Sequence, residues 1–456
     1  MSSSSERRHL RGRQLLFFLW LVVLCVAVVA FLHRGGPRRN VVVILLDTVR
    51  ADRLGCYGSS LGLTPAMDSL ARDSVRFENA FAHAPWTLPS VASLLTSQLP
   101  AQHRAGGRLG QFRPLPESAV TLAEHFRDAG AATCAITNVL FLTEAFGMTQ
   151  GFDSVDAYAD ATNVRMRRAG LTTELALRWL DERPDGPFLL LVHYFDPHLI
   201  YDPLQPFRKE FADPRDQEKS PKPLFGTRED MLNFRRGSAQ LEPDTIGRLE
   251  KLYNGEIAYL DSQVGRLLAG LELRGLDSET IVLLTADHGE EFLDHGGFEH
   301  GHTLYRELLH VPLILRAGGE SQVITATVGL MDVAPTLCEL AGIPTAPEFS
   351  GKSLVPFLDG EETRDRPVLA EGNMWGESGQ AWRNGSYTLI RQPTVRRPQL
   401  FDTRADPKEQ TDLSAEQSSQ RDRMLLDLDL ILRFLKPTPS PPLSNEELAR
   451  LRALGY

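Results

Sequence analysis

Cysteine is scarce in this sequence. The 456 residues include four cysteines, and Cys25 lies inside a long apolar run near the amino terminus. Cys56, Cys134 and Cys338 remain, and three residues cannot all pair with one another. No two cysteines have the CxxC spacing, so the sequence excludes a zinc ribbon and a disulfide framework. The cysteines do not decide whether the protein works in an oxidising or a reducing compartment.

The sequence also has no excess of basic over acidic residues. The chain has 49 lysines and arginines against 59 aspartates and glutamates, a formal net charge of −10. Seven of the arginines but only one of the acids lie in residues 1–39, so the remainder of the chain is more acidic still. An acidic protein repels phosphate backbones, which argues against a nucleic-acid partner. An anionic substrate would need a metal ion or local basic groups to bind here.

One uninterrupted apolar run, LLFFLWLVVLCVAVVAFL, occupies residues 15–32. At about 1.5 Å per residue, a helix of this length just crosses the hydrocarbon core of a bilayer. Four arginines precede the run and three follow it, which places residues 1–14 in the cytoplasm. We therefore predict a single-pass membrane protein whose main domain lies on the extracytoplasmic side. A cleaved signal peptide is the alternative, although no small-x-small cleavage site ends the run.

From residue 40 onward, continuous apolar runs alternate with helical patterns. The runs are VVVILL at 41–46, ATCAIT at 132–137, FLLLVHYF at 188–195, IVLLTA at 281–286 and VPLIL at 311–315. Continuous runs suit strands that are buried on both faces of a parallel sheet. The helical patterns at 121–129, 163–182 and 244–273 would cover those faces. The alternation predicts a large α/β domain over residues 40–345.

Two other regions differ from this pattern. Residues 203–243 are rich in proline and charge and predict a long polar loop. Beyond residue 345, short strand-like segments at 386–391 and 399–402 precede a helical pattern at 416–435. We expect a smaller α+β subdomain over 346–435, followed by a linker and a terminal helix over 436–456.

Acids and histidines follow the ends of three predicted strands. Asp47 follows the first strand, Asp287 and His288 follow IVLLTA, and His193 and His198 lie at and beyond the end of FLLLVHYF. Ligands of open α/β sheets bind outside the carboxyl ends of the strands. Oxygen ligands with an imidazole suit a divalent ion. Aspartates also commonly cap loops, so for each acid alone a structural role is an equal alternative.

Histidines concentrate in one stretch of the chain. Five of the twelve fall within 23 residues, at His288, His295, His300, His302 and His310. The concentration indicates a functional site. His310, directly before VPLIL, is the member that best fits a structural role.

The segment APWTLPSVASLLTS at 84–97 places a hydroxyl at the start of a helix. The pattern predicts Thr87 as the N-cap and Pro89 in the first turn. Capping is the default role of such a threonine. The same position offers free N–H groups to an anion, and a metal would let the hydroxyl attack phosphorus or sulfur.

These segments together resemble the sulfatase family within the alkaline phosphatase superfamily. The matching stretches, in chain order, are NVVVILLDTVRADRLGCYG, TPAMDSLARDSVRFENAFAHAPWTLPSVASLLTS, HYFDPH, TADHGEEFLDHGGFEHGHTLYRELLHVPLIL and LFDTRADPKEQTDLS. The resemblance implies an α/β sandwich with a large, mostly parallel central sheet flanked by helices. It also implies a metal-dependent hydrolase or transferase that acts on phosphate, phosphonate or sulfate esters.

By this resemblance, one divalent ion (Ca²⁺, Mg²⁺, Mn²⁺ or Zn²⁺) is held by Asp47, Asp287 and His288. Thr87 completes the ligand shell and is the catalytic nucleophile. Thr48 stands where many sulfatases have a second metal-binding aspartate.

The resemblance also assigns residues on the substrate side. His198 in DPH and His300 in EHG match catalytic contacts to the substrate and the leaving group. Asn138 falls roughly where many sulfatases place a substrate-binding lysine. His193 and His302 complete the predicted substrate-binding set.

The nucleophile departs from the sulfatase pattern. Sulfatases carry C-x-P-x-R or S-x-P-x-R, whose first residue is oxidised to formylglycine, whereas this chain has Thr87-Leu88-Pro89-Ser90-Val91. Threonine cannot form that aldehyde, so no formylglycine-generating enzyme is needed. The sequence favours a phosphate or phosphonate ester over a sulfate ester. A sulfatase proper and a catalytically inactive sulfatase-like binding protein are the alternatives.

Overall fold

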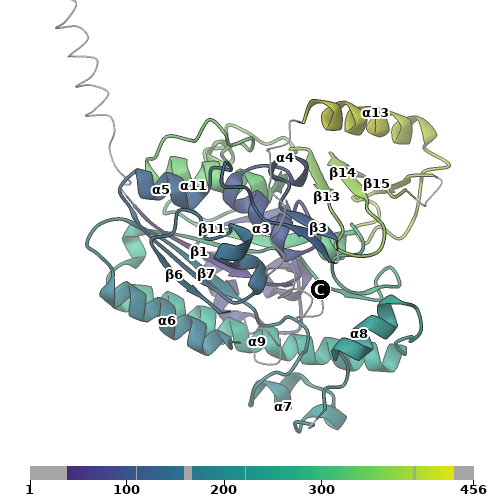
Figure 1. The fold of residues 1–456 in the computed structure, drawn as a ribbon, viewed down its shortest axis with the longest axis horizontal. Coiled ribbons are helices and arrows are strands. Elements are labelled where there is room, and N and C mark those ends of the chain that lie inside the picture. The colour runs from purple at the N-terminus through teal and green to yellow at the C-terminus, as the bar shows by residue number, and fades with distance from the viewer. Residues whose placement is uncertain (1–38, 109, 159–166, 221, 394–396, 436–456) are drawn as a thin grey trace, which may run out of the picture.

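The computed structural model describes residues 39–108, 110–158, 167–220, 222–393 and 397–435 (Figure 1). The predicted cytoplasmic segment 1–14, the transmembrane helix 15–32 and the terminal segment 436–456 lie outside these residues. Within the described ranges, no helix combines the length and the apolar character that a membrane crossing requires.

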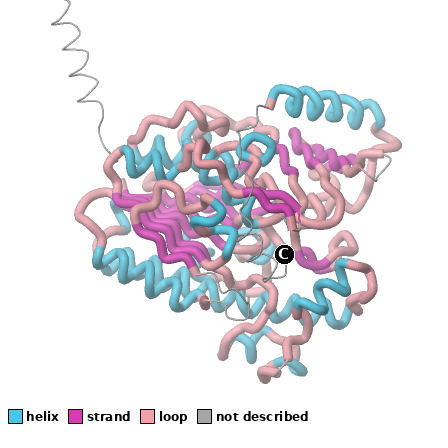
Figure 2. The backbone as a smooth tube through the Cα atoms, in the orientation of Figure 1, coloured by secondary structure: helices cyan, strands magenta, loops and turns pink. Residues whose placement is uncertain are grey.

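An eight-stranded sheet forms the centre of the molecule (Figures 1 and 2). Its spatial order is β12-β2-β11-β8-β1-β7-β5-β6. β11 is antiparallel to β2 and β8, and all other neighbours are parallel, so the sheet is mixed but mostly parallel, as predicted. The strands are β1 (Asn40–Leu46), β2 (Val75–Phe81), β5 (Ala132–Thr137), β6 (Ser154–Ala157), β7 (Phe188–Tyr194), β8 (Thr280–Ala286), β11 (His310–Arg316) and β12 (Gln322–Gly329).

The five apolar runs in the sequence all form strands of this sheet. Every residue of β1, β7 and β8 is buried, which explains why these runs are continuous rather than alternating. The sequence analysis missed β2, β6 and β12. β6 is exposed along its length and lies at one edge, so it lacks the apolar signal of a central strand.

Helices cover both faces of the sheet (Figure 1). On one face lie α2 (Pro65–Arg72), α6 (Ala169–Glu182) and α9 (Pro243–Leu273), of which α6 and α2 both pack on α9. On the other lie α3 (Thr87–Thr96), α5 (Leu122–Asp128) and α11 (Val333–Ala341), which pack on one another. Short helices are α4 (Pro100–His103), α10 (Arg306–Leu309) and α12 (Val355–Leu358). Two small hairpins pair β3 (Gly106–Arg108) with β4 (Gln111–Arg113) and β9 (Glu291–Phe292) with β10 (Phe298–Glu299).

The segment predicted as a long polar loop is partly helical. It contains α7 (Phe207–Phe211) and α8 (Arg228–Arg235). Phe225 and Met231 pack with Tyr253 of α9 and with Phe292 and Phe298 of the β9–β10 hairpin. This second apolar cluster anchors the segment, so it is more ordered than its composition indicates.

The carboxyl-terminal region forms its own antiparallel sheet, as predicted. Its strands are β13 (Val368–Glu371), β14 (Gln380–Asn384), β15 (Tyr387–Arg391) and β16 (Gln399–Asp402), and α13 (Ser418–Phe434) covers them. Leu389 and Leu400 pack against Met424 and Leu428 of that helix.

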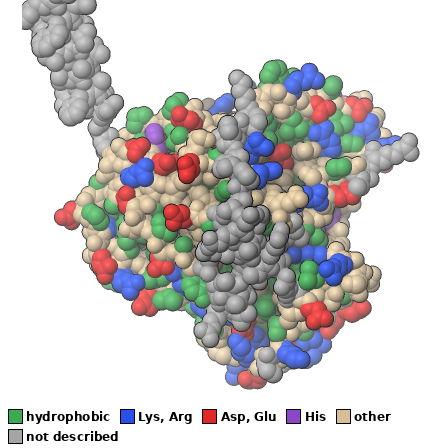
Figure 3. Space-filling model, in the orientation of Figure 1, with side chains coloured by type: hydrophobic (Ala, Val, Ile, Leu, Met, Phe, Trp, Pro, Cys, Tyr) green, Lys and Arg blue, Asp and Glu red, His purple; other side chains and the backbone are tan. Residues whose placement is uncertain are grey.

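On the face in view, described side chains of both charge signs are interspersed (Figure 3).

Candidate functional site

The register of the central sheet brings two acids to one edge. Leu46 of β1 lies opposite both Tyr194 of β7 and Ala286 of β8. The backbone N–H of Asp47 donates to Tyr194, and that of Asp287 donates to Leu46. The residues that follow these strands therefore emerge side by side, as parallel strand ends do.

Asp47, Asp287 and His288 form a group suited to a metal ion, which we call the metal group. One ligand atom from each lies within 4.8 Å of the other two, and all three side chains are fully buried. Among the described residues, both carboxylate oxygens of Asp47 and Oδ2 of Asp287 have no partner in hydrogen-bond geometry, although Nε2 of His193 lies 3.2 Å from Oδ2 of Asp47. Buried unpaired carboxylates are costly, so a divalent cation fits this donor set on chemical grounds.

The pKa values of the two acids move in opposite directions. Burial and the neighbouring charge of Asp47 raise the pKa of Asp287 well above its usual range. Burial also raises the pKa of Asp47, but His193, His198 and His288 outweigh it and lower that pKa to about 2. Two carboxyls this close resist ionising together unless a cation lies between them.

His288 presents one ring nitrogen to this group. Its Nδ1 lies 2.9 Å from the carbonyl of Gly289 and donates to it, which leaves the lone pair of Nε2 free in the neutral ring. Nε2 lies 3.4 Å from Oδ2 of Asp287 and 3.8 Å from Oδ1 of Asp47. The ring is therefore held in the tautomer that binds metals.

Thr87 lies next to the same group. Its Oγ1 is 3.4 Å from Nε2 of His288, and the residue is 4% exposed. Thr87 is the first residue of α3 and Trp86 is the N-cap, so the predicted capping role was wrong by one position. Since its hydroxyl caps no backbone N–H, it remains available at a helix end that favours anions. Ser90, one turn later, donates to the carbonyl of Asp287 at 2.6 Å and ties α3 to β8.

His193 is fully buried beside Asp47. Its Nδ1 accepts from the backbone N–H of Asn138 at 3.3 Å, so the neutral ring carries its proton on Nε2. Nε2 lies 3.2 Å from Oδ2 of Asp47. This position favours a role in orienting Asp47 rather than the substrate contact predicted from the sequence.

Asn138 is also buried behind the site. Its amide nitrogen donates to the carbonyl of His193 and to Oγ1 of Thr172, and its oxygen accepts from Arg167. The side chain is thus occupied in joining β5 to β7. This geometry favours a positioning role over the predicted substrate contact.

His198 and His300 lie together next to His288. Their rings are 5.1 Å apart, and the ring of His300 lies 4.5 Å from that of His288. His198 stacks on Phe195, and its Nδ1 contacts the carbonyl of Leu199 at 2.8 Å, which leaves Nε2 available. The contact of either histidine with a leaving group stays a prediction.

Glu290 is a functional candidate that the sequence analysis missed. Its Oε1 lies 2.8 Å from Nδ1 of His300, and its Oε2 accepts from the hydroxyl of Tyr201 at 2.8 Å. Glu290 is fully buried, and burial raises its pKa to about 8. The sequence signal that could have identified Glu290 is its position two residues after His288 in the motif DHGEE.

The other three histidines of the cluster make mainly structural contacts. His295 lies between Glu307 and the carbonyl of Glu409 and stacks on Tyr305. Nε2 of His302, a predicted substrate contact, lies 2.8 Å from Glu291, and its ring stacks on Trp375. His310 contacts the carbonyl of Glu78 at 2.8 Å, consistent with the structural role favoured for it.

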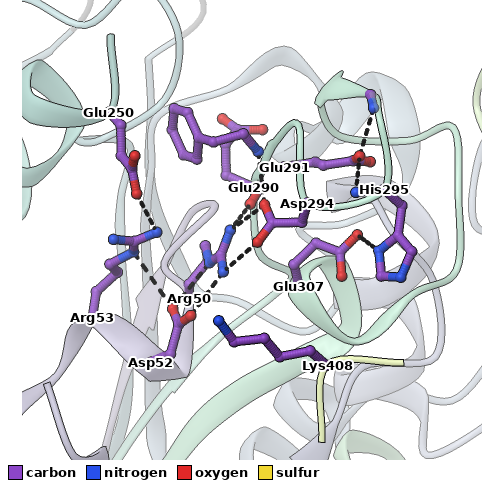
Figure 4. A network of polar contacts seen from close by, with 12 residues as sticks. Arg50, Asp52, Arg53, Glu250, Glu290, Glu291, Asp294, His295, Glu307 and Lys408 are labelled. Carbon is purple, nitrogen blue, oxygen red and sulfur yellow. Dashed lines mark hydrogen bonds and ion pairs between the residues drawn. The ribbon is translucent and has the colours of Figure 1, made fainter. Parts of the chain in front are cut away.

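Arg50 joins the loop after β1 to the loop after β8 (Figure 4). Its guanidinium forms ion pairs with Asp52 and Asp294 and donates to the carbonyl of Glu290 at 3.1 Å. The backbone N–H of Arg50 donates to the hydroxyl of Tyr253, which itself donates to the carbonyl of Thr48. These contacts hold together the two loops that carry the metal group.

The fold and the site define an ester hydrolase built on an α/β sheet. The chain belongs to the sulfatase family of the alkaline phosphatase superfamily, whose family model, described as "Sulfatase", matches residues 39–343. The residues of the metal group and Thr87 all lie within this match.

Similar proteins come from several organisms. An arylsulfatase of Clostridium perfringens is 26% identical and aligns with 84% of this chain and 92% of its own. A delta 4,5-hexuronate-2-O-sulfatase of Bacteroides thetaiotaomicron is 26% identical over 93% of this chain and 95% of its own. Among solved structures, the phosphonate monoester hydrolase of Agrobacterium radiobacter superposes with a TM-score of 0.70 at 22% identity, covering 87% and 95% of the two chains.

Proposed function

We propose that the chain is a divalent-metal-dependent hydrolase of phosphate or phosphonate esters with Thr87 as its nucleophile. The observation that supports this most directly is the position of the Thr87 hydroxyl, 3.4 Å from Nε2 of His288, which itself lies 3.4 Å from Asp287 and 3.8 Å from Asp47. A hydroxyl at a helix start that caps nothing is available for chemistry.

Asp47, Asp287 and His288 would hold the ion, with Thr87 as the fourth protein ligand. When bound, the ion would lower the pKa of the threonine hydroxyl and offset the charge of the ester group. His193 would keep the carboxylate of Asp47 oriented from behind, because their contact at 3.2 Å is fully buried.

The Thr87 oxygen would attack phosphorus, forming the Oγ1–P bond as the bond to the leaving oxygen breaks. His198 or His300 would donate a proton or a hydrogen bond to that oxygen. Glu290 would hold His300 in place through its contact with Nδ1. Water, or an acceptor hydroxyl, would then attack phosphorus opposite the threonine oxygen and regenerate Thr87.

A threonine nucleophile also affects which esters the enzyme can turn over. A formylglycine hydrate can release sulfate by returning to its aldehyde, whereas a threonine adduct must be cleared by attack at phosphorus or sulfur. Phosphorus beside a metal suits that displacement. We therefore expect faster turnover of phosphate or phosphonate esters than of sulfate esters.

A substrate panel tests this proposal. The purified protein, expressed without a formylglycine-generating enzyme, is assayed with nitrophenyl phosphate, a bis-ester of phosphate, a phenyl phosphonate ester and nitrophenyl sulfate. The phosphorus esters should have the highest kcat/KM. A higher kcat/KM on the sulfate ester than on every phosphorus ester would refute the substrate assignment.

Hydrolysis of sulfate esters is the second candidate. The observation in its favour is that the curated relatives include an arylsulfatase and a hexuronate sulfatase that align over most of this chain. The same panel separates the two candidates, because both use the same metal group and differ in the atom attacked.

We also propose that the apolar run at 15–32 anchors the enzyme in a membrane with the catalytic domain outside the cytoplasm. The flanking arginines support this orientation. Protease added to intact cells should digest the domain. Digestion that requires lysis would contradict the orientation.

A further inference from the structure

A cavity of about 530 Å³ lies on the opposite side of β11 from β8. Its walls come from β2, β11 and β12 of the central sheet, the turn between β14 and β15, and the segment after β16. None of the metal-binding, catalytic or substrate-binding residues proposed above lines it. Its size is within the range of ordinary ligand pockets.

Arginines dominate the charge of this cavity. Arg76, Arg306, Arg383 and Arg404 line it, against Glu78 and Asp365. Both acids have other contacts nearby, since Asp365 accepts from the backbone N–H of Thr327 and Glu78 lies 4.0 Å from Arg76. We refer to this space as the arginine cavity.

Arg383 is buried and only partly paired. Its Nη2 lies 3.0 Å from Oε1 of Glu409, but its Nε and Nη1 have no hydrogen-bond partner among the described residues. The residue is 3% exposed, so water does not freely supply those partners. Buried charged donors without acceptors are costly, which indicates that an acceptor is missing.

The charge of Arg306 has even fewer partners than that of Arg383. Within the described part of the chain its guanidinium forms no ion pair, and Nη2 lies 3.3 Å from Oδ1 of Asn79 and from Nε2 of His310. That imidazole nitrogen also contacts the carbonyl of Glu78 at 2.8 Å. A nitrogen that donates to a carbonyl cannot also accept from an arginine. Among the described residues, Asn79 is therefore the one acceptor for the guanidinium of Arg306.

The two guanidiniums share one aromatic ring. Arg383 lies 4.5 Å and Arg306 5.3 Å from the centre of Phe81, and Glu409 is ion-paired with Arg383 alone. Burial, opposed by the charge of Glu409 and aided by the charge of Arg383, lowers the pKa of Arg306 to about 10. Thr388, whose buried hydroxyl has no partner in the described ranges, adds a further donor to the same wall.

We propose that the arginine cavity is a second binding site, for a tetrahedral oxyanion group such as phosphate or sulfate. Two guanidiniums and a hydroxyl, from α10, β14 and β15, offer several donors, which matches the three or four acceptor oxygens of a phosphate or sulfate better than the two of a carboxylate. The group can be a free anion or the end of a larger ester, because the cavity has room for more than one small ion.

Titration calorimetry on the full-length, metal-loaded protein tests this site with inorganic phosphate, inorganic sulfate and glucose 6-phosphate. The wild type should show two binding steps with at least one of these probes, one at the metal group and one at the cavity. Arg306→Met should weaken one step at least about tenfold, as expected for a lost charge-assisted contact. Arg178→Met, which changes an exposed arginine on α6, is the matched control and should leave both steps unchanged.

Thr388→Val is a second variant that keeps the test decisive if Arg306→Met folds poorly. It removes an unpartnered hydroxyl without a change of shape, so stability should hold while binding of the same step weakens. Binding of the inorganic anions alone would identify a free ion as the ligand, and binding of the ester alone would identify a larger molecule. Identical isotherms for wild type, both variants and the control would overturn the proposal. Inorganic anions are not turned over, so their isotherms do not depend on the role of Thr87. The glucose 6-phosphate titration is run in a Thr87→Ala background, so hydrolysis at the metal group does not contribute heat.

Discussion

The metal group and the arginine cavity hold buried unpaired charge of opposite sign. At the metal group, carboxylate oxygens of Asp47 and Asp287 lack partners at the carboxyl ends of β1 and β8. In the cavity, nitrogens of Arg383 lack partners beside β2. A folded protein normally satisfies its buried polar groups, so unpaired charges gathered at one place support a ligand there. From the sign of each charge we propose a cation at the first place and an anion at the second.

The two regions also differ in backbone strain. Thr48, next to Asp47, has a φ of 57°, an unusual value for a β-branched residue. Among the described residues that line the cavity, the one with such a φ is Gly385, which adopts it without cost. Strain of this kind concentrates at catalytic sites, whereas a binding pocket does not require it.

The largest effect should come from removing a metal ligand. Asp287→Asn should lower metal affinity by at least about a hundredfold and abolish turnover, because a neutral amide replaces a buried anionic ligand. Elemental analysis after gel filtration measures the bound metal. Asp181→Asn, at an exposed ion pair with Arg274, is the control and should keep its metal. Full metal occupancy in Asp287→Asn would exclude this residue from the metal group.

Thr87→Ala should separate metal binding from chemistry. We expect the variant to keep its metal and lose at least about a hundredfold in kcat, as for a missing covalent nucleophile. Thr87→Ser keeps a hydroxyl at the same place and should retain more activity than the alanine variant. Mass spectrometry of acid-quenched wild type should find the adduct on the peptide that contains Thr87. Wild-type kcat in Thr87→Ala would refute the mechanism.

Glu290→Gln should have a smaller effect that acts through His300. We expect kcat to fall about tenfold with metal content unchanged, since outer groups that orient a functional histidine contribute at this level. Tyr201→Phe removes the other hydrogen bond of Glu290 and should affect kcat less. Loss of metal from Glu290→Gln would instead place the residue in the metal group.

The smallest expected effect concerns the strain at Thr48. Asparagine adopts the left-handed conformation more readily than a β-branched residue, so Thr48→Asn should raise the free energy of unfolding by about 1 kcal/mol. Thermal denaturation of the chelator-treated protein measures this without a contribution from metal binding. A lower melting temperature than wild type would show that the side chain of Thr48 matters more than its backbone.

Much of the fold could be predicted because its signals are local. The continuous apolar runs at 41–46, 188–195 and 281–286 predicted β1, β7 and β8, since strands buried on both faces need apolar side chains throughout. The acids directly after β1 and β8 then indicated the metal group, because parallel strands end at one edge. The edge strand β6 gave no such signal, since exposed side chains need not be apolar.

The sequence by itself determined the central strands and the order of the motifs, and its resemblance to sulfatases led to the proposal that Thr87 is the nucleophile. Only the tertiary structure decided which histidines face the metal group and which make structural contacts. It also brought Glu290 to His300 and gathered Arg306 and Arg383 around Phe81, although these residues come from separate parts of the chain. The physical reason is that a strand or helix depends on neighbouring residues, whereas a hydrogen bond, an ion pair or a cavity depends on side chains that meet only after the sheet and its coverings have packed.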